Sequence, residues 1–454
     1  MRDWPFCGSS CESGGDLRSK IPLIYTCSFR GRGEFTDLVG HAEGTNRACT
    51  PNTIYKSRAM PATLSAGFLL PDRRSTMSRY IFSSESVSEG HPDKVSDYIS
   101  DSVLDACFEQ DKYSRVACET LCKSDTVVLA GEITTNAKLD YDQIVRQAVK
   151  DIGYTDVAEP FCDTTLKVMS LITRQSNEID QGVTLKTSQS GDQGAGDQGI
   201  MFGYATDESP ELMPLPLLLA HKLTKGVSED RKANTVAWLR PDNKSQVSVL
   251  YEDNTPKEVT AVVVSTQHSP EADQKKITEY VREELGPRVL GAWWRNDIPL
   301  HVNPTGSFTH GGPSADAGVT GRKIIVDTYG GSGRHGGGAF SGKDPSKVDR
   351  SSAYFCRYVA KQVVAAGLAK KVEIQVGYAI GLAKPISVKV DTFGTGDEAA
   401  AEKFVMDTFD FRPRMIIERF DLLRPIYRST TNYGHFGRPG LPWEAVEKAA
   451  AVAR

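Results

Sequence analysis

The sequence contains no long apolar run and no strong excess of charge. Its longest hydrophobic stretch, LMPLPLLLA at residues 212–220, is interrupted by two prolines. It falls well short of the roughly 18 to 20 apolar residues that a membrane span needs. The 54 basic and 58 acidic residues give a formal net charge of −4, which indicates neither a nucleic-acid partner nor a disordered chain. A chain of 454 residues with 39% hydrophobic side chains suits a globular protein of two to four domains, without a membrane or nucleic-acid partner.

Cysteine is also scarce, with nine residues and no C-x-x-C pair recurring at zinc-ligand spacing. This usage predicts reduced thiols and a cytoplasmic location. Four of the nine cysteines lie in the first 50 residues, within a segment rich in Gly, Ser and Arg that lacks periodicity. We expect residues 1–77 to be an extension, disordered or non-native. Its seven acidic residues are unusual for a transit peptide, so two interpretations stay open: a targeting segment, or an upstream start with Met77 as the true start.

A helix-like segment followed by two strand-like segments occurs three times. HPDKVSD (residues 91–97) aligns with DPSKVDR (residues 344–350), sharing Pro, Lys and Val in register. For the copy with its helix over 212–225, chance similarity of short amphipathic helices remains an equal alternative. The pattern predicts an α+β fold of three similar βα-type subdomains, with helices packed on mixed sheets, near residues 79–178, 193–309 and 311–447. Predicted helices and their strands are 92–110 with 115–121 and 126–134, 212–225 with 246–251 and 258–265, and 345–368 with 371–380 and 386–393.

A glycine-rich segment, GGSGRHGGGAFSGKDP (residues 330–345), follows a predicted strand over 323–329. It is not a dinucleotide fingerprint, because no helix begins at the third glycine of its G-x-G-x-x-G match. It is not a P-loop either, because Asp344 replaces the hydroxyl residue that holds magnesium. Glycine amides, a helix predicted to open at Pro345, and nearby cations nevertheless indicate a polyphosphate site. A flexible turn with solvated lysines is the alternative. The cations are Arg322, Lys323, Arg334, Lys343 and Lys347.

Two carboxylates fall in the first turns of the repeated helices, Asp93 and Asp349. Magnesium is often held by one or two carboxylates together with substrate phosphates, so the pair predicts one shared magnesium site. Each carboxylate could instead simply complement its helix N-terminus. His91, beside Asp93, could donate a hydrogen bond to a leaving oxygen or act as a general acid, or be structural. The further acidic stripe at residues 97, 101 and 105 predicts a solvated helix face.

Three motifs resemble the signatures of S-adenosylmethionine synthetases: GHPDK (residues 90–94), GAGDQG (194–199) and GGGAFSGKDPSKVDR (336–350). RPDNKSQV, STQHS, NPTG, GRKIIVDTYGG and YGHFGR match in order, so the resemblance runs from about residue 78 to 443. It implies pseudo-threefold symmetry and a homodimer, often paired into tetramers, with sites between subunits. It implies attack of methionine sulfur on C5′ of ATP, release of triphosphate, and cleavage of triphosphate to pyrophosphate and phosphate. Two magnesium ions per site and potassium are the implied cofactors.

The resemblance also implies a role for individual residues. Catalytic roles fall on His91, Lys244, Arg322, Lys343 and Lys347; the first four would also bind ATP, with Asp242, Phe308, Asp316, Lys323 and Ala339. Methionine contacts would be Glu132, Gln175, Asp316 and Lys347; Asp93 and Asp349 would bind magnesium and Glu119 potassium. Residues 175–194 would form a mobile lid. Two rival functions are a nucleotide-binding scaffold that lost turnover and a phosphotransferase.

Overall fold

The computed structural model describes residues 78–174 and 192–447. The predicted extension at 1–77, Gln175 and most of the predicted lid lie outside the described residues. No helix in the described ranges is long and apolar enough to cross a membrane.

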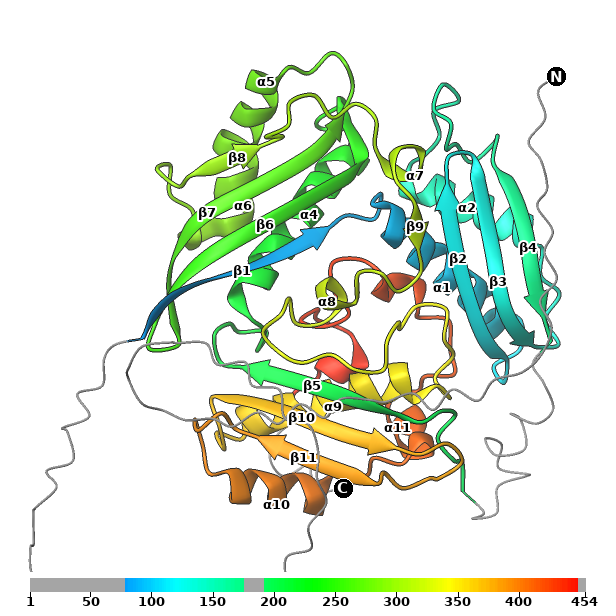
Figure 1. Cartoon of the computed structure of the whole chain (residues 1–454), viewed down its shortest axis with the longest axis vertical. Helices are drawn as coiled ribbons and strands as arrows, with labels where there is room; N and C mark the ends of the chain where they lie inside the picture. The colour runs from blue at the N-terminus through cyan, green and yellow to red at the C-terminus, as the bar shows by residue number, and fades with distance from the viewer. Residues whose placement is uncertain (1–77, 175–191, 448–454) are drawn as a thin grey trace, which may run out of the picture. The chain divides into compact units, whose positions relative to one another are not determined.

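Three sheets form the framework, with strand orders β1-β6-β7-β8, β11-β10-β5 and β4-β3-β2-β9 (Figure 1). The strands are β1 (Arg79–Val87), β2 (Arg115–Lys123), β3 (Thr126–Thr134), β4 (Lys167–Thr173), β5 (Gly199–Thr206), β6 (Leu239–Glu252), β7 (Thr255–His268), β8 (Leu300–Val302), β9 (Gly318–Val319), β10 (Lys371–Tyr378) and β11 (Ser387–Asp391). The helices are α1 (Pro92–Gln110), α2 (Tyr141–Ile152), α4 (Leu215–Lys232), α5 (Gln274–Glu279), α6 (Gly286–Leu290), α7 (Gly312–Ala315), α8 (Ile324–Asp327), α9 (Val348–Ala365), α10 (Glu398–Thr408) and α11 (Pro413–Phe420).

The predicted repeat of one helix and two strands is present three times, as α1-β2-β3, α4-β6-β7 and α9-β10-β11. In each copy the helix packs on its own hairpin, and the first hairpin strand pairs antiparallel with a strand from another part of the chain. β9 joins β2, β1 joins β6 and β5 joins β10. The α+β prediction is therefore confirmed, and the copy that chance similarity could have explained is present as α4-β6-β7. Since every sheet draws on two distant segments, the predicted subdomain boundaries stay a prediction.

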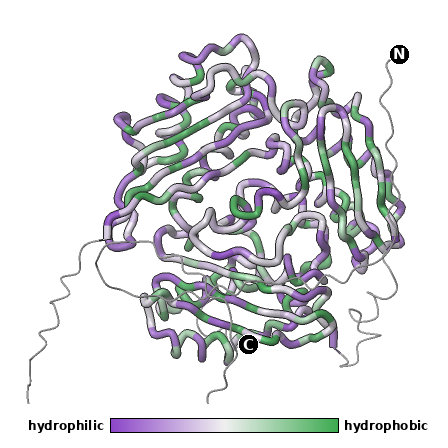
Figure 2. Tube along the Cα trace, in the orientation of Figure 1, coloured by the Kyte–Doolittle hydropathy of each residue, from purple (hydrophilic) through white to green (hydrophobic). Residues whose placement is uncertain are grey.

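Local sequence explains why these elements form where they do. The β6–β7 hairpin turns at Asp253 and Asn254, whose φ angles of 49° and 61° suit a two-residue turn and residue types that tolerate the left-handed region. Strands alternate in hydropathy along their length (Figure 2), so one face of each sheet is apolar. Each apolar face packs against helices as one of three hydrophobic cores.

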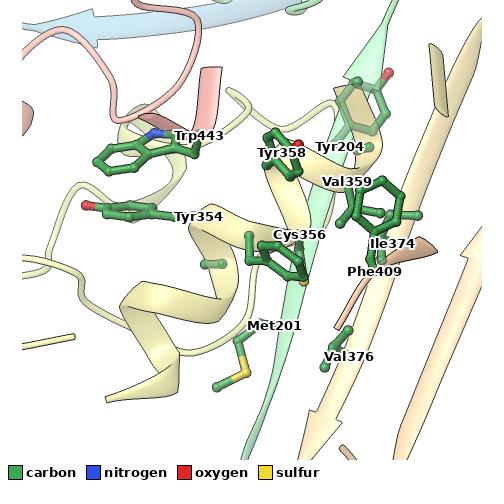
Figure 3. Packing of buried hydrophobic residues seen from close by; sticks show 14 of the residues in the cluster. Met201, Tyr204, Tyr354, Cys356, Tyr358, Val359, Ile374, Val376, Phe409 and Trp443 are labelled. Carbon is green, nitrogen blue, oxygen red and sulfur yellow. The ribbon is translucent and has the colours of Figure 1, made fainter. Parts of the chain in front are cut away.

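The largest core lies between α9 and the β5-β10-β11 sheet (Figure 3). The same core continues on the side of α9 away from the sheet, where Tyr354 and Trp443 stack with ring centroids 3.8 Å apart. Gly203 in β5 lets α9 approach closely, because a Cβ atom at that position would lie 2.0 Å from the carbonyl carbon of Cys356. The backbone of α9 therefore packs directly against the backbone of β5 at Gly203.

Strand β6 begins well before the predicted 246–251, and β2, β7, β10 and β11 differ from their predicted bounds by one to three residues at an end. Three other predicted elements differ in kind or in where they begin. The run at 323–329 is not a strand but contains the single helical turn α8, because Asp327 is drawn into the interior by an ion pair with Lys94. The helix predicted over 212–225 begins and ends later, since Leu212 has a φ angle of 59° that no helix continues. The third helix begins at Val348 rather than Pro345, after a turn in which Lys347 N–H donates to the Asp344 carbonyl.

The acidic stripe of α1 was predicted to be solvated, and this prediction is wrong. Asp97, Asp101 and Asp105 are all at most 2% exposed. Each accepts hydrogen bonds from another segment: Asp97 from the Gly321 amide, Asp101 from Arg350, and Asp105 from the amides of residues 427 and 428. Buried carboxylates need such partners, and only the tertiary fold supplies them.

Candidate active site

Asp93, at the start of α1, gathers two of the predicted phosphate-binding cations. Its carboxylate lies 2.6 Å from Lys323 Nζ and 3.3 Å from Arg322 Nε, and it accepts the Val319 amide at 3.0 Å. Burial raises the pKa of this carboxyl, but the hydrogen bonds from Lys323 and from the Val319 N–H outweigh burial and hold the pKa below its ordinary value. Asp93 is therefore an anion among cations, and we call this group the α1 cluster.

His91 precedes Asp93 and caps the same helix. Its Nδ1 accepts the Asp93 amide at 3.2 Å, so the ring proton of the neutral imidazole is on Nε2. Burial, followed by the charge of Lys323, lowers the pKa of His91 to about 3. His91 can thus offer an Nε2–H hydrogen-bond donor at neutral pH. The hydrogen-bonding form of its predicted role fits this geometry better than a protonated general acid does.

Three more predicted site residues lie close to the α1 cluster: Asp242 and Lys244 on β6, and Asp316 in the segment before β9. Asp242 accepts the Gly312 amide at 2.8 Å through Oδ2, whereas its buried Oδ1 has no hydrogen-bond partner among the described residues. Burial raises the pKa of Asp242 to about 6. Lys244 and Asp316, both exposed, each act electrostatically on His91 and on Asp242. An unsatisfied buried acceptor is costly, so Asp242 is suited to receive a substrate donor group.

The backbone of Phe308 is held by two hydrogen bonds with His268 at the end of β7. Its amide donates to His268 Nε2 and its carbonyl accepts the His268 amide, both at 3.0 Å. Its side chain is half-buried. The structure thus fixes the position of the residue, while the predicted stacking of its ring on adenine stays a prediction.

The glycine-rich segment carries a second cluster, which we call the loop cluster. Lys343 Nζ pairs with Asp349, and Lys347 Nζ pairs with Asp344. Burial raises the pKa of Asp349 above its ordinary value against the opposing charge of Lys343. Burial acts to raise the pKa of Asp344 as well, but the charges of Lys347 and Arg115 and the hydrogen bonds to the carboxylate outweigh burial and hold this pKa below its ordinary value.

Backbone pairing places the loop cluster beside the β4-β3-β2-β9 sheet. Lys343 forms an antiparallel bridge with Ala117, and Ala117 is paired with Glu132 on β3. Directly paired residues share a sheet face, so Lys343 and Glu132 point the same way, about 10 Å apart at two strand spacings. Glu119 lies two residues after Ala117, on the same face, and both glutamates are exposed. Predicted phosphate, methionine and potassium residues therefore meet on one surface.

The two clusters are separate within the chain. No hydrogen bond or ion pair between described residues joins them, although Ala339 lies against Gly321, next to Arg322. Arg334, another predicted cation of the segment, pairs with Glu373 and joins neither cluster. A shared magnesium site for Asp93 and Asp349 stays a prediction. The part of the chain that the structure describes has no group of three or more His, Cys, Asp or Glu side chains that could hold a metal unaided.

Sequence reasoning missed the buried charges behind both clusters. Lys94, in the second position after the proline of GHPDK, is 1% exposed and lies 2.6 Å from Asp327 and 2.9 Å from Asp97. Arg350, the last residue of the third motif, is fully buried against Asp101. The only signal in the sequence was the number of charged residues on two otherwise apolar helices.

The fold and the site together define a class of protein: an α+β protein that gathers lysine and arginine side chains, paired with aspartates, and that is suited to bind a polyanionic substrate. Comparisons with known proteins narrow this class. The chain matches the N-terminal domain of S-adenosylmethionine synthetase at residues 79–177, the central domain at 192–308 and the C-terminal domain at 310–445.

Two similar proteins are both named S-adenosylmethionine synthase. One, from Sorangium cellulosum, is 56% identical over 380 residues, which cover 83% of this chain and 90% of the relative. The other, from Akkermansia muciniphila, is 55% identical over 378 residues, which cover 81% and 96%. The chain belongs to the S-adenosylmethionine synthetase family, and it is an enzyme of the methionine adenosyltransferase type.

Proposed function

We infer that this chain makes S-adenosyl-L-methionine from ATP and L-methionine, and we propose the residues that do so. The methionine sulfur attacks C5′ of ATP, the C5′–O bond breaks, and the triphosphate leaves and is then hydrolysed to pyrophosphate and phosphate. The observation that carries the proposal is the pairing of three predicted substrate-binding lysines, Lys323, Lys343 and Lys347, each with a carboxylate, because such lysines can exchange that carboxylate for phosphate oxygens.

The leaving triphosphate gains charge at its bridging oxygen as the C5′–O bond breaks. Lys244, Arg322, Lys343 and Lys347 supply fixed positive charge against it, with Lys323 and the backbone at Ala339 completing the phosphate surroundings. His91 donates its Nε2–H to the nucleotide near the leaving oxygen. Asp242, through its unsatisfied Oδ1, receives a donor group of the nucleoside, and Phe308 stacks on the adenine.

Methionine is held on the exposed face that Lys343 shares with Glu132. An exposed carboxylate suits the substrate ammonium group, and a lysine suits its carboxylate. Within the described ranges the proposed methionine residues are Glu132, Lys347 of the loop cluster and Asp316 beside the α1 cluster, with Gln175 beyond those ranges.

The residues present fit magnesium. Asp93 and Asp349 each offer one carboxylate, already in contact with a lysine cation, and magnesium is commonly held by one or two carboxylates and substrate phosphates. When bound, magnesium supplies positive charge that neutralises the triphosphate. Two such ions per site are proposed. Glu119 is the proposed potassium ligand, as an exposed carboxylate on the methionine-binding face.

A second copy of the chain is the proposed partner. The face that carries Glu119 and Glu132 also exposes Leu121, Met169 and Leu171 at 42%, 53% and 57%. A contiguous apolar face of this kind is typical of an interface. Covering it with a second copy would enclose the methionine residues between subunits, in a homodimer or a homotetramer. The cytoplasmic location stays a prediction.

The function is tested by incubating the full chain with ATP, L-methionine, magnesium and potassium. We expect S-adenosylmethionine together with equal amounts of phosphate and pyrophosphate, and no S-adenosylmethionine when methionine is omitted. Formation of ADP or of a phosphorylated product would instead identify a phosphotransferase. Binding of ATP without turnover would identify a nucleotide-binding scaffold.

A further inference from the structure

We propose that Asp101 and Arg350 are positioning residues for the phosphate-binding loop, a role that rests on the proposed function of Lys343. Neither residue is exposed, so neither touches substrate. They join the middle of α1 to the start of α9, and both form hydrogen bonds with the backbone of the loop that carries Lys343.

Asp101 receives the loop backbone and the arginine on the same carboxylate. Its Oδ1 accepts the Gly342 amide at 2.8 Å and Arg350 Nη1 at 2.7 Å, while Oδ2 accepts Nη2 at 2.7 Å. Arg350 Nη1 also donates to the Lys343 carbonyl at 3.3 Å. The ion pair therefore holds the Gly342–Lys343 dipeptide at both ends, through the N–H of Gly342 and the C=O of Lys343.

The loop has little freedom to shift on the opposite side. Gly342 has a φ angle of 79°, and a Cβ atom there would lie 1.9 Å from the Cys118 carbonyl oxygen. The Gly342 carbonyl accepts the Cys118 amide at 3.0 Å, and the Asp344 amide donates to Val116 at 3.1 Å. The backbone of Lys343 is thus fixed between a β-strand and a buried ion pair.

The guanidinium group of Arg350 also contacts three side chains other than Asp101. Its Nε donates to Tyr354 Oη at 2.9 Å and its Nη2 to Thr430 Oγ1 at 3.1 Å, and its guanidinium carbon lies 4.3 Å from the Tyr427 ring centroid. Tyr354 stacks on Trp443 in the main core (Figure 3). A rigid core element therefore sets the position of the guanidinium.

The same helix sets the distance between the two clusters. Asp101 lies eight residues after Asp93 in α1, about 12 Å along the helix axis at 1.5 Å per residue. The loop cluster is therefore held at a fixed distance from the α1 cluster by the helix and by Asp101. A displacement of about 1 Å in a group that binds the transition state costs on the order of 100-fold in rate.

The test compares Asp101→Asn with Glu444→Gln. Glu444 is bound by Arg357 through two hydrogen bonds of 2.9 Å and 3.0 Å, so it is a second buried carboxylate held by an arginine of α9. None of its described contacts is with the loop. Both substitutions remove one buried negative charge and keep the side-chain volume. Both variants are expected to melt at a lower temperature than the wild type.

The readout is the hydrolysis of added tripolyphosphate by the full chain with magnesium. Asp101→Asn is expected to lose roughly 10- to 100-fold in kcat/KM for tripolyphosphate, whereas Glu444→Gln keeps it within about twofold. Asp101→Glu keeps the charge but moves the carboxylate by one methylene. It is expected to raise the KM for tripolyphosphate and, because it keeps the charge, to lower the melting temperature less than Asp101→Asn does, which keeps the test decisive if Asp101→Asn does not fold.

The outcomes separate this inference from the function on which it rests. If the wild type does not hydrolyse tripolyphosphate, or Lys343→Met hydrolyses it as well as the wild type, the proposed function of Lys343 is wrong. If Lys343→Met is impaired but the folded Asp101 variants behave as Glu444→Gln does, the positioning role is refuted and the ion pair is only structural.

Discussion

Lys94→Met is the substitution for which the structure gives the sharpest expectation. The lysine is 1% exposed and lies between two buried carboxylates, with Nζ 2.6 Å from Asp327 and 2.9 Å from Asp97. Burial alone would lower the pKa of Lys94, but the charges of Asp327 and Asp97 raise it above its ordinary value. Methionine has a similar length and no charge, so the change removes the cation and leaves the shape.

The expected loss in the free energy of unfolding comes from the carboxylates that stay buried without a cation. Breaking a buried ion pair by removing one partner typically costs about 3–5 kcal/mol, because an uncompensated charge stays buried. Two carboxylates remain in this case. Total stability of a folded protein is only about 5–15 kcal/mol, so the variant is expected to be marginal at neutral pH.

The loss should also depend on pH in a defined direction. Burial already raises the pKa of both Asp97 and Asp327, and without the ammonium group the pKa of each rises further. The folded variant then holds a proton that the unfolded chain releases above about pH 4, so its stability falls as the pH rises. Each additional bound proton is worth about 1.4 kcal/mol per pH unit. The difference in unfolding free energy from the wild type should therefore be smaller at about pH 5 than at about pH 7.5.

Urea unfolding at both pH values measures this, with Lys361→Met as the control. Lys361 is also a buried lysine, 2.8 Å from Glu444, but that carboxylate keeps two hydrogen bonds from Arg357. We expect a loss of about 1–2 kcal/mol in the control, with little dependence on pH. A Lys94→Met variant that loses no more than the control, or loses equally at both pH values, would refute the reasoning.

Three further predictions concern catalysis, the metal and the core. Lys343→Met should abolish S-adenosylmethionine formation from ATP and methionine while leaving the melting temperature close to that of the wild type; unchanged turnover would contradict its proposed role. Asp93→Asn should raise the magnesium concentration needed for half-maximal activity, which a magnesium titration measures; an unaltered requirement would exclude Asp93 as a ligand. Gly203→Ala should cost several kcal/mol, because the new methyl group meets the Cys356 backbone at 2.0 Å. Gly440→Ala, with open space around its Cβ position and a φ angle of 92°, should cost about 1 kcal/mol in the same urea titration.

Much of the fold could be predicted from periodicity and repetition. The helix over 92–110 and the strand over 126–134 match the structure at both ends, because Pro92 and the alternation in β3 are local signals. The run at 323–329 could not be predicted in this way. Its β-branched residues favour a strand, but Asp327 is pulled inward by Lys94, which lies more than 200 residues earlier in the chain.

The sequence alone determined which residue types the site would use and in which motifs. Glycines, lysines and two first-turn aspartates indicated a polyphosphate site, because the chemistry of a polyanion selects those groups wherever the fold puts them. The resemblance of three motifs supplied the family, which the comparisons confirm.

Only the tertiary structure decided which charges are buried and which face a substrate. The aspartates of α1 look alike in sequence, since they recur at helical spacing on one face. In the structure both are buried, but Asp93 contacts cations of the site, whereas Asp101 pairs with Arg350 and supports a loop from another part of the chain. The cost of burying a charge depends on the partner that the fold brings to it, and no local pattern carries that information.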